Sequence, residues 1–255
     1  MMQCVLIHGL GGRPSSWDKV VEELSDESDV EALGLPGHGE RAALRATDSF
    51  GDVAVHLWQE LAPGAGQSVH LVGYSLGARV AMAMREERPE AVSRLTLIAG
   101  HPGLRDEAER QARRAWDQEW STRLRDEGIQ GFVDAWENLP LFESQRRLAS
   151  SVRASHRKRR LSHDALGLGW AFDVLGLGNM PSFWSGLQSA DLPIDYLVGG
   201  LDSKYRAIGQ ELVGACKSAR MRVAPAVGHD LVLEAPDWVA HQIAEPPRHG
   251  VRRGC

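Results

Sequence analysis

The sequence predicts an α/β fold with a doubly wound, mostly parallel sheet of about six strands. Short apolar runs alternate with segments of helical periodicity, and most runs are apolar on both faces, as in a parallel sheet covered by helices. Such alternation is typical of right-handed β-α-β crossovers. The expected strands are Cys4–Ile7, Val30–Leu33, Val69–Val72, Leu95–Ala99, Ile194–Val198 and Met221–Ala224.

The helices expected around these strands follow from apolar periodicity and from helix-ending residues. The segment Ala78–Arg88 is rich in Ala and Met, and Pro89 ends it because proline cannot continue a helix. The remaining helices of the core are expected at Ser16–Ser25, Asp202–Ala215 and Pro236–Ala244.

One long interval breaks the alternation and predicts an inserted helical lid over the carboxyl edge of the sheet. Over ninety residues separate Ala99 from Ile194, far more than one crossover helix needs. We expect an α/β core at 1–100 and 188–245, a lid at 101–187 and a disordered tail at 246–255. The lid helices are expected at Glu107–Arg125, Gln130–Asn138 and Ser144–Leu161. Most of its tryptophans should pack it onto the core: Trp116, Trp120, Trp136, Trp170 and Trp184.

Composition narrows the possible partners. The chain has 255 residues and a formal net charge of −5, with acidic and basic residues mixed along most of its length, which argues against a nucleic-acid partner. No apolar run approaches the ~20 residues of a membrane span, and no signal segment opens the chain. The three cysteines lack metal-ligand spacing. We therefore expect a cytoplasmic protein without membrane, metal or cofactor, and its oligomeric state stays open.

The turn Gly73-Tyr74-Ser75-Leu76-Gly77 predicts a nucleophilic serine. It is a G-x-S-x-G motif between an expected strand and an expected helix, the setting that gives this motif its meaning in the α/β-hydrolase fold. Ser75 must sit on a strained turn with its hydroxyl raised above the sheet. Glycine at 73 and 77 removes side chains that would collide with the neighbouring helix and strand. The alternative is an ordinary β-α turn.

The loop after the first strand, Ile7-His8-Gly9-Leu10-Gly11-Gly12, predicts an oxyanion hole. We expect its donors to be the backbone N–H groups of Leu10 and Leu76. A phosphate-binding loop is the alternative, but no Lys-Ser/Thr follows the glycines and the G-x-G-x-x-G spacing is absent. His8 should brace the loop.

The base and acid follow from chain order, because this fold places the serine first, the acid second and the histidine last. Asp202 follows the strand at Ile194–Val198, and His229 follows the last strand, so we assign them as acid and base. The acids Asp195 and Asp230 fit less well, because one lies within a strand and the other adjoins the base. His241 and His249 fit less well as the base, because one falls on the expected terminal helix and the other in the tail. The histidines expected to be structural are His56, His70, His156 and His163.

Arginines predict an anionic substrate. Arg79 lies one helical turn after Ser75, and guanidinium groups match carboxylates with two parallel hydrogen bonds. The dense basic run from Arg153 to Arg160 is mostly a solvated helix face, with a few members turned inward. Composition alone does not identify which ones.

With these residues assigned, the sequence resembles the 2-succinyl-6-hydroxy-2,4-cyclohexadiene-1-carboxylate synthase family, α/β-hydrolase-fold lyases of menaquinone biosynthesis. The resemblance spans about residue 3 to about residue 243. Departures are Gly34 where relatives commonly have Asp, and Ala78 where Gly is usual. The matching motifs are Ile7-His8-Gly9-Leu10, Leu35-Pro36-Gly37-His38-Gly39, Val72-Gly73-Tyr74-Ser75-Leu76-Gly77-Ala78-Arg79, Gly100-His101-Pro102-Gly103-Leu104 and Asp202-Ser203-Lys204-Tyr205.

The resemblance implies loss of pyruvate from 2-succinyl-5-enolpyruvyl-6-hydroxy-3-cyclohexene-1-carboxylate, with Ser75 acting as a base on a substrate C–H. Arg160 could shift in register to Arg157 or Arg159. The residues implied to contact this small-molecule polycarboxylate are Tyr74, Arg79, Arg113, Trp136, Arg160 and Lys204. A carboxylester or thioester hydrolase acting through an acyl-enzyme is the alternative, and a non-catalytic ligand-binding protein is a third reading that the complete set of Ser75, Asp202 and His229 disfavours.

Overall fold

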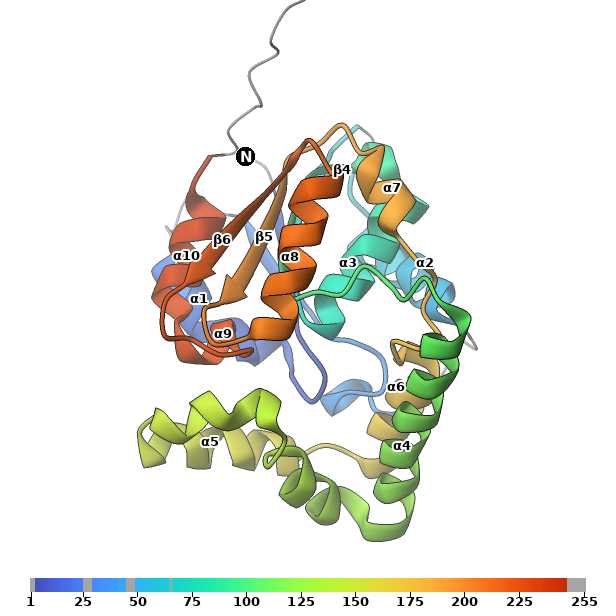
Figure 1. Cartoon of the computed structure of the whole chain (residues 1–255), viewed down its shortest axis with the longest axis vertical. Coiled ribbons are helices and arrows are strands. Elements are labelled where there is room, and N and C mark those ends of the chain that lie inside the picture. The colour runs from blue at the N-terminus through green and yellow to red at the C-terminus, as the bar shows by residue number, and fades with distance from the viewer. Residues whose placement is uncertain (1–2, 25–28, 45–48, 65, 247–255) are drawn as a thin grey trace, which may run out of the picture.

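A computed structural model describes residues 3–24, 29–44, 49–64 and 66–246, and its centre is a six-stranded sheet (Figure 1). The strand order is β2-β1-β3-β4-β5-β6, and every neighbouring pair is parallel. The predicted α/β fold is thereby confirmed. The strands are β1 (Cys4–Ile7), β2 (Val30–Leu33), β3 (Val69–Tyr74), β4 (Val92–Ile98), β5 (Ile194–Gly199) and β6 (Ala219–Ala224).

Helices cover both faces of the sheet, and each face has its own apolar cluster (Figure 1). On one face, α1 (Asp18–Glu23) packs against α10 (Pro236–Ala244). The other face holds α2 (Phe50–Leu61), α3 (Leu76–Glu87) and α8 (Ser203–Ala215). Helix α2 was not among the expected helices, although it buries six apolar side chains. No helix in the described ranges is both long and apolar enough to cross a membrane.

The interval between β4 and β5 contains helices and no strand, and all of its residues are described. Figure 1 shows it descending beside the core and then running beneath the carboxyl ends of the strands. Its members are α4 (Glu107–Trp136), the 3-10 segment Pro140–Arg147, α5 (Ser150–Leu161), α6 (Ala165–Leu175) and α7 (Trp184–Gln188). We call residues 101–187 the helical insertion.

Of the three helices expected in the insertion, two match the structure and one does not. The expected helices Glu107–Arg125 and Gln130–Asn138 correspond to the two helical parts of α4, which are separated at Gly128, where a φ of 68° and a ψ of −170° are not helical. The expected continuous helix Ser144–Leu161 is wrong, because Leu148 and Ala149 are extended between the 3-10 segment and α5. Apolar periodicity does not distinguish two short helices from one when the break exposes no glycine or proline.

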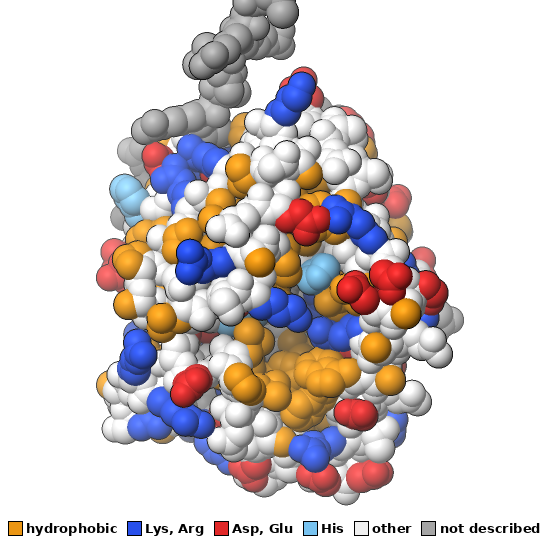
Figure 2. All heavy atoms as spheres, viewed as in Figure 1, with side chains coloured by type: hydrophobic (Ala, Val, Ile, Leu, Met, Phe, Trp, Pro, Cys, Tyr) orange, Lys and Arg blue, Asp and Glu red, His pale blue; other side chains and the backbone are white. Residues whose placement is uncertain are grey.

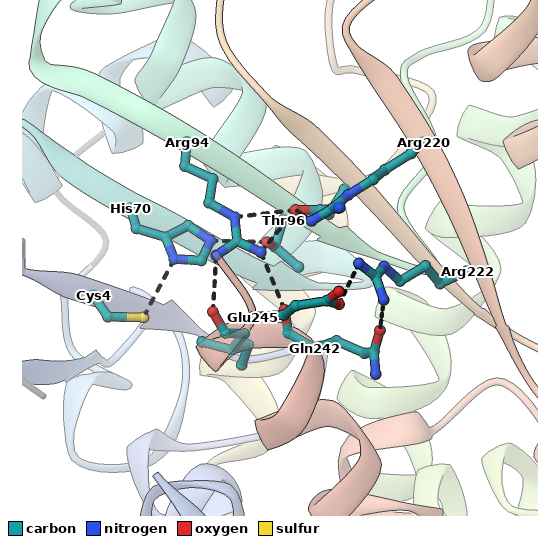
Figure 3. Close-up of polar contacts among 10 residues, drawn as sticks. Cys4, His70, Arg94, Thr96, Arg220, Arg222, Gln242 and Glu245 are labelled. Carbon is teal, nitrogen blue, oxygen red and sulfur yellow. Dashed lines mark hydrogen bonds and ion pairs between the residues drawn. The ribbon is translucent and has the colours of Figure 1, made fainter. Parts of the chain in front are cut away.

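β4 begins at Val92, three residues before the predicted strand. The prediction missed its start because Arg94 interrupts the apolar run in the sequence. Arg94 is 2% exposed, and its Nη2 donates to Oδ2 of Asp195 on β5 at 2.8 Å (Figure 3). Arg94 also donates to the carbonyls of Gln242 and Ile243 at the end of α10. Arg220 pairs with the same aspartate. This network ties the last helix to the amino ends of the strands, away from Ser75.

Replacing Arg94 tests the weight of this network. The variant Arg94→Leu leaves a buried carboxylate with one partner fewer, so we expect the free energy of unfolding to fall by about 3–5 kcal/mol in urea denaturation. The matched control is Arg125→Leu, which removes a solvent-exposed ion pair with Asp173 and should cost about 0–1 kcal/mol. An equal loss of unfolding free energy in the two variants would contradict a stabilising role for the buried Arg94 network.

Candidate active site

Ser75 lies on a strained turn between β3 and α3. Its φ of 52° and ψ of −105° place a non-glycine residue at positive φ. Such conformations persist only when the surroundings enforce them, and they concentrate at functional sites. Here the Ser75 amide donates to the carbonyl of Ile98 on β4 at 2.8 Å, which fixes the turn to the sheet.

Gly73 and Gly77 allow this turn because the chain passes very close to its neighbours there. A Cβ at position 77 would lie 2.0 Å from the carbonyl oxygen of Ile7 at the end of β1. A Cβ at position 73 would lie 2.3 Å from the carbonyl oxygen of Gly77. The collisions expected from the sequence are therefore present, one with the strand and one with the helix.

The structure brings Ser75, His229 and Asp202 into contact. His229 Nδ1 lies 2.7 Å from Oδ2 of Asp202, and its Nε2 lies 3.1 Å from Oγ of Ser75. A carboxylate only accepts, so the imidazole proton is on Nδ1 and the free lone pair of Nε2 faces the serine hydroxyl. His229 and Asp202 are buried, which excludes water from the contact. The arrangement can deprotonate Ser75.

The rival acids have other partners. Asp195 pairs with Arg94 at the opposite end of β5. Asp230 caps α9 (Leu231–Glu234) by accepting from the Leu233 amide at 3.2 Å, and it also accepts from Gln145 of the helical insertion. Burial raises the pKa of Asp230. Among the late histidines, His241 lies on α10, and His249 falls outside the described residues.

The loop after β1 presents backbone donors beside Ser75. Gly9 and Gly12 close a tight turn through a 3.0 Å hydrogen bond, which places Leu10 at its first corner. His8 Nδ1–H donates to the Gly9 carbonyl at 2.8 Å, while His8 Nε2 accepts from the Leu35 amide. The Gly9 carbonyl and the Leu10 N–H belong to one planar peptide and point in opposite directions, so His8 orients that N–H.

The second expected donor is the Leu76 N–H, the first of α3, where a helix leaves its N–H groups without intrahelical partners. In the described part of the chain, no hydrogen bond occupies the N–H of Leu10 or Leu76. Neither N–H is therefore already committed to an acceptor in the described part of the protein, and Leu10 lines the same cavity as Ser75.

Between the core and the helical insertion lies a cavity of about 890 Å³. Figure 2 shows the surface hollowed here, with hydrophobic side chains inside the hollow and Lys and Arg side chains at its edge. Ser75 and His229 open into the cavity. All six residues implied to contact substrate also line it: Tyr74, Arg79, Arg113, Trp136, Arg160 and Lys204.

An aromatic cluster forms one wall of this cavity. Trp136 packs against Trp120 and Phe172, with ring centroids 4.9 and 5.6 Å away. Trp116 and Phe142 also line the cavity, and both contact the Trp136 ring. The sequence argument singled out Trp136 and missed Phe142. In the sequence, Phe142 is one of several bulky apolar residues in the insertion. Its residue type does not show whether it lines the cavity or only packs inside the insertion.

Three cations gather at the end of the cavity near α3. Arg79 Nη1 donates to the Leu175 carbonyl at 2.7 Å, and burial together with the charge of Arg113 lowers its pKa to about 10. Arg113 pairs with the buried Asp117 at 2.9 Å, and its guanidinium stacks 4.3 Å from the Trp116 ring centre. Lys204, on α8, completes the group. One carboxylate does not neutralise three cations, so this end of the cavity favours an anion.

Helix α5 supplies a second cationic group to the cavity lining. Arg160 is 4% exposed, pairs with Glu137 at 3.2 Å and lies 4.9 Å from the Phe142 ring centre. Arg159 also lines the cavity, whereas Arg157 is absent from its walls and pairs with Glu137. His156, expected to be structural, also lines the cavity. Burial and the charges of Arg160 and Arg159 lower the pKa of His156 to about 2.

With the geometry established, comparison with known proteins identifies the family. The family model described as "Alpha/beta hydrolase family" matches residues 4–242. A 2-succinyl-6-hydroxy-2,4-cyclohexadiene-1-carboxylate synthase from Enterobacter sp. (strain 638) is 33% identical over 241 residues, which cover 94% of this chain and 90% of that protein. This chain belongs to that synthase family of α/β hydrolases.

Further members of the synthase family agree. The protein of that name from Escherichia coli O1:K1 / APEC is 31% identical over 94% of this chain and 92% of its own. The structure titled "Structure of MenH from S. aureus" superposes with a TM-score of 0.90 at 29% identity, covering 95% of this chain and 91% of that one. A thermophilic esterase from Thermogutta terrifontis, at 24% identity and a TM-score of 0.79, shares the fold. The resemblance read from the motifs is confirmed.

The contact between Gly77 and β1 predicts the effect of a single added methyl group. In Gly77→Ala the new Cβ must displace the end of β1, so we expect about 1–3 kcal/mol of lost stability and loss of activity. The matched control is Gly214→Ala on α8, where nothing lies within 4 Å of the added carbon. It should gain about 0.5–1 kcal/mol. Urea denaturation of both variants measures the difference, and a stable, active Gly77→Ala would contradict the geometry.

Buried histidines predict a steep acid limb of stability. Burial lowers the pKa of His38 to about 4 and that of His163 to about 3, so both stay neutral in the folded protein while the unfolded chain gains protons below about pH 6.5. Stability is therefore full above pH 6.5 and falls by about 1.4 kcal/mol per pH unit for each such histidine as the pH drops toward 4. Urea denaturation at pH 7 and pH 5 measures this loss, and equal stability at the two values would contradict it.

Proposed function

We propose that this protein eliminates pyruvate from 2-succinyl-5-enolpyruvyl-6-hydroxy-3-cyclohexene-1-carboxylate and releases 2-succinyl-6-hydroxy-2,4-cyclohexadiene-1-carboxylate. The observation that carries the proposal is the combination of a basic serine with cations in one cavity. Ser75 contacts His229 at 3.1 Å, and arginines from α3, α4 and α5 line the same space. The relatives named as this synthase support the same reaction.

The proposed reaction begins with proton transfer. Ser75, deprotonated by Nε2 of His229, removes the hydrogen of the ring carbon that carries the succinyl ketone, and Asp202 stabilises the imidazolium. Negative charge then develops on the ketone oxygen, which accepts hydrogen bonds from the N–H groups of Leu10 and Leu76. These donors stabilise the enolate, not a tetrahedral adduct, so no bond to Ser75 forms.

Elimination follows from the enolate. Its electron pair shifts through the ring alkene, forms the two double bonds of the diene and breaks the carbon–oxygen bond to the enolpyruvyl group. The departing enolate takes up a proton and becomes pyruvate. One proton leaves the ring and one joins pyruvate, so the step balances without a redox partner.

The charges of the cavity support a polycarboxylate. The proposed substrate carries a carboxylate on its ring, one on its succinyl arm and one on its enolpyruvyl group. Arg79 and Arg113 lie beside Leu175 and Asp117, whereas Arg160 lies beside Glu137 and Phe142, so the cavity offers two separate cationic groups to separated carboxylates. The aromatic wall between them, with Trp136, contacts the ring and the apolar parts of the arms.

An ester or thioester hydrolase is the second candidate, because the contacts of Ser75, His229 and Asp202 also suit an acyl-enzyme. The arginines count against it. A neutral ester would leave the half-buried guanidinium of Arg79 without an anionic partner in the cavity, at a cost in binding.

Pyruvate release tests the proposal directly. Purified protein mixed with the enolpyruvyl substrate should produce pyruvate, detected with lactate dehydrogenase and NADH, and Ser75→Ala should lower kcat by at least about 10³-fold because the base is lost. Arg79→Met should mainly raise KM, because a carboxylate contact is lost in both ground and transition states. Ser218→Ala, whose hydroxyl donates to the Ala190 carbonyl far from the cavity, is the matched serine control.

The opposite result is equally definite. If the wild-type protein releases no pyruvate but hydrolyses p-nitrophenyl butyrate with a burst of p-nitrophenol, the protein is an ester hydrolase and the proposed lyase function is wrong.

A further inference from the structure

Three histidines stack between the sheet and the helical insertion. The His8 and His38 ring centres lie 5.1 Å apart, the His38 and His163 ring centres lie 5.9 Å apart, and both pairs meet edge to face. All three residues are at least 96% buried. His8 follows β1, His38 lies in the loop after β2, and His163 lies in the insertion between α5 and α6. The stack therefore joins segments distant in the sequence at residues 8–12, the loop after β1 that we call the oxyanion loop.

His163 makes one hydrogen bond with each ring nitrogen. Its Nδ1 accepts from the Gly39 amide at 3.0 Å, so its proton must be on Nε2. Nε2–H then donates to the Gly11 carbonyl at 3.0 Å. The Gly39 amide thus fixes the tautomer that can hold Gly11.

With the Gly11 contact, the carbonyl groups on both sides of Leu10 are hydrogen-bonded to a histidine. His8 donates to the Gly9 carbonyl on one side of Leu10, and His163 donates to the Gly11 carbonyl on the other. Residues 9 to 12 include three glycines, which restrain the backbone poorly by themselves. Gly11 adopts a φ of +66°, so the turn depends on these outside contacts for one conformation.

We propose that His163 is a positioning residue: by holding the Gly11 carbonyl, it aims the Leu10 N–H at the oxygen that becomes negative beside Ser75. The oxyanion hole is then complete only when the helical insertion is docked on the core. This inference deepens the proposed function and rests on its oxyanion hole. His163 itself touches no reacting atom.

The surroundings keep His163 in the required neutral form. Burial, together with the charges of His38, Arg13 and Arg160, lowers the pKa of His163 to about 3. His38 Nδ1–H donates to the Pro36 carbonyl at 3.0 Å, and its buried Nε2 has no partner among the described residues. The His38 ring therefore serves as a neutral spacer between His8 and His163.

The test compares two buried histidines with different positions. His163→Leu removes both hydrogen bonds at the oxyanion loop. His70→Leu is the matched control, because His70 is also buried and neutral and donates or accepts at Thr96 Oγ1, but it lies at the amino end of β3. His163→Gln restores a donor and an acceptor. Thermal unfolding of each variant records the purely structural cost.

Two readouts separate positioning from stability. In pyruvate release, His163→Leu should lower kcat about 10- to 100-fold and leave KM within about threefold, with partial recovery in His163→Gln, because a misplaced donor is lost mainly in the transition state. Phenylboronic acid forms a tetrahedral adduct with a serine hydroxyl and places an oxygen in the oxyanion position. Its affinity should fall at least tenfold in His163→Leu and stay unchanged in His70→Leu.

The boronate measurement also keeps the two proposals apart, because it needs Ser75 and the backbone donors but no lyase substrate. If the wild-type protein releases no pyruvate, the proposed function fails while the boronate affinities still test His163. If His163→Leu binds phenylboronic acid as tightly as the wild type, or loses no more kcat than His70→Leu, the positioning role is overturned and His163 is a packing residue.

Discussion

The structure depends on the close contact of the first turn of α3 with the end of β1. Gly77 lies so near the Ile7 carbonyl that no side chain fits between them. The contact holds the first turn of α3 against Ile7 and His8, and Ser75, two residues before Gly77, adopts its positive φ on the turn that leads into this helix. The strained turn that carries the Ser75 hydroxyl thus adjoins this close contact, and His229 and Asp202 are arranged around that hydroxyl.

The helical insertion reaches the catalytic loops from two sides. At the oxyanion loop, His163 holds the Gly11 carbonyl. At the other side, Ser144 donates to Glu234, whose carboxylate also accepts from the Gly228 amide next to His229. The two contacts lie near opposite ends of the segment that contains α5. The docked insertion therefore contacts both the loop that contains Leu10 and the loop that contains His229.

Local features of the sequence predicted the parts of the site that local geometry controls. G-x-S-x-G, the glycine loop and the order of Ser75, Asp202 and His229 each depend on a strand ending at one edge of the sheet, so their positions follow once the strands are recognised. The expected single helix at 144–161 and the missed role of Arg94 depend on partners over one hundred residues away or on side-chain packing. The inward choice of Arg160 over Arg157 likewise depends on where Glu137 and Phe142 lie.

Ser75 is proposed to act as a base toward carbon and to form no covalent intermediate. The most direct test of this proposal is single-turnover pyruvate release from substrate carrying deuterium on the ring carbon that bears the succinyl group. If Ser75 is the base, the rate should be at least about twofold slower than with the protium substrate, because that bond breaks in the step that Ser75 catalyses. Equal rates with the two isotopes, together with an acyl group on Ser75 in the intact-mass spectrum, would contradict it.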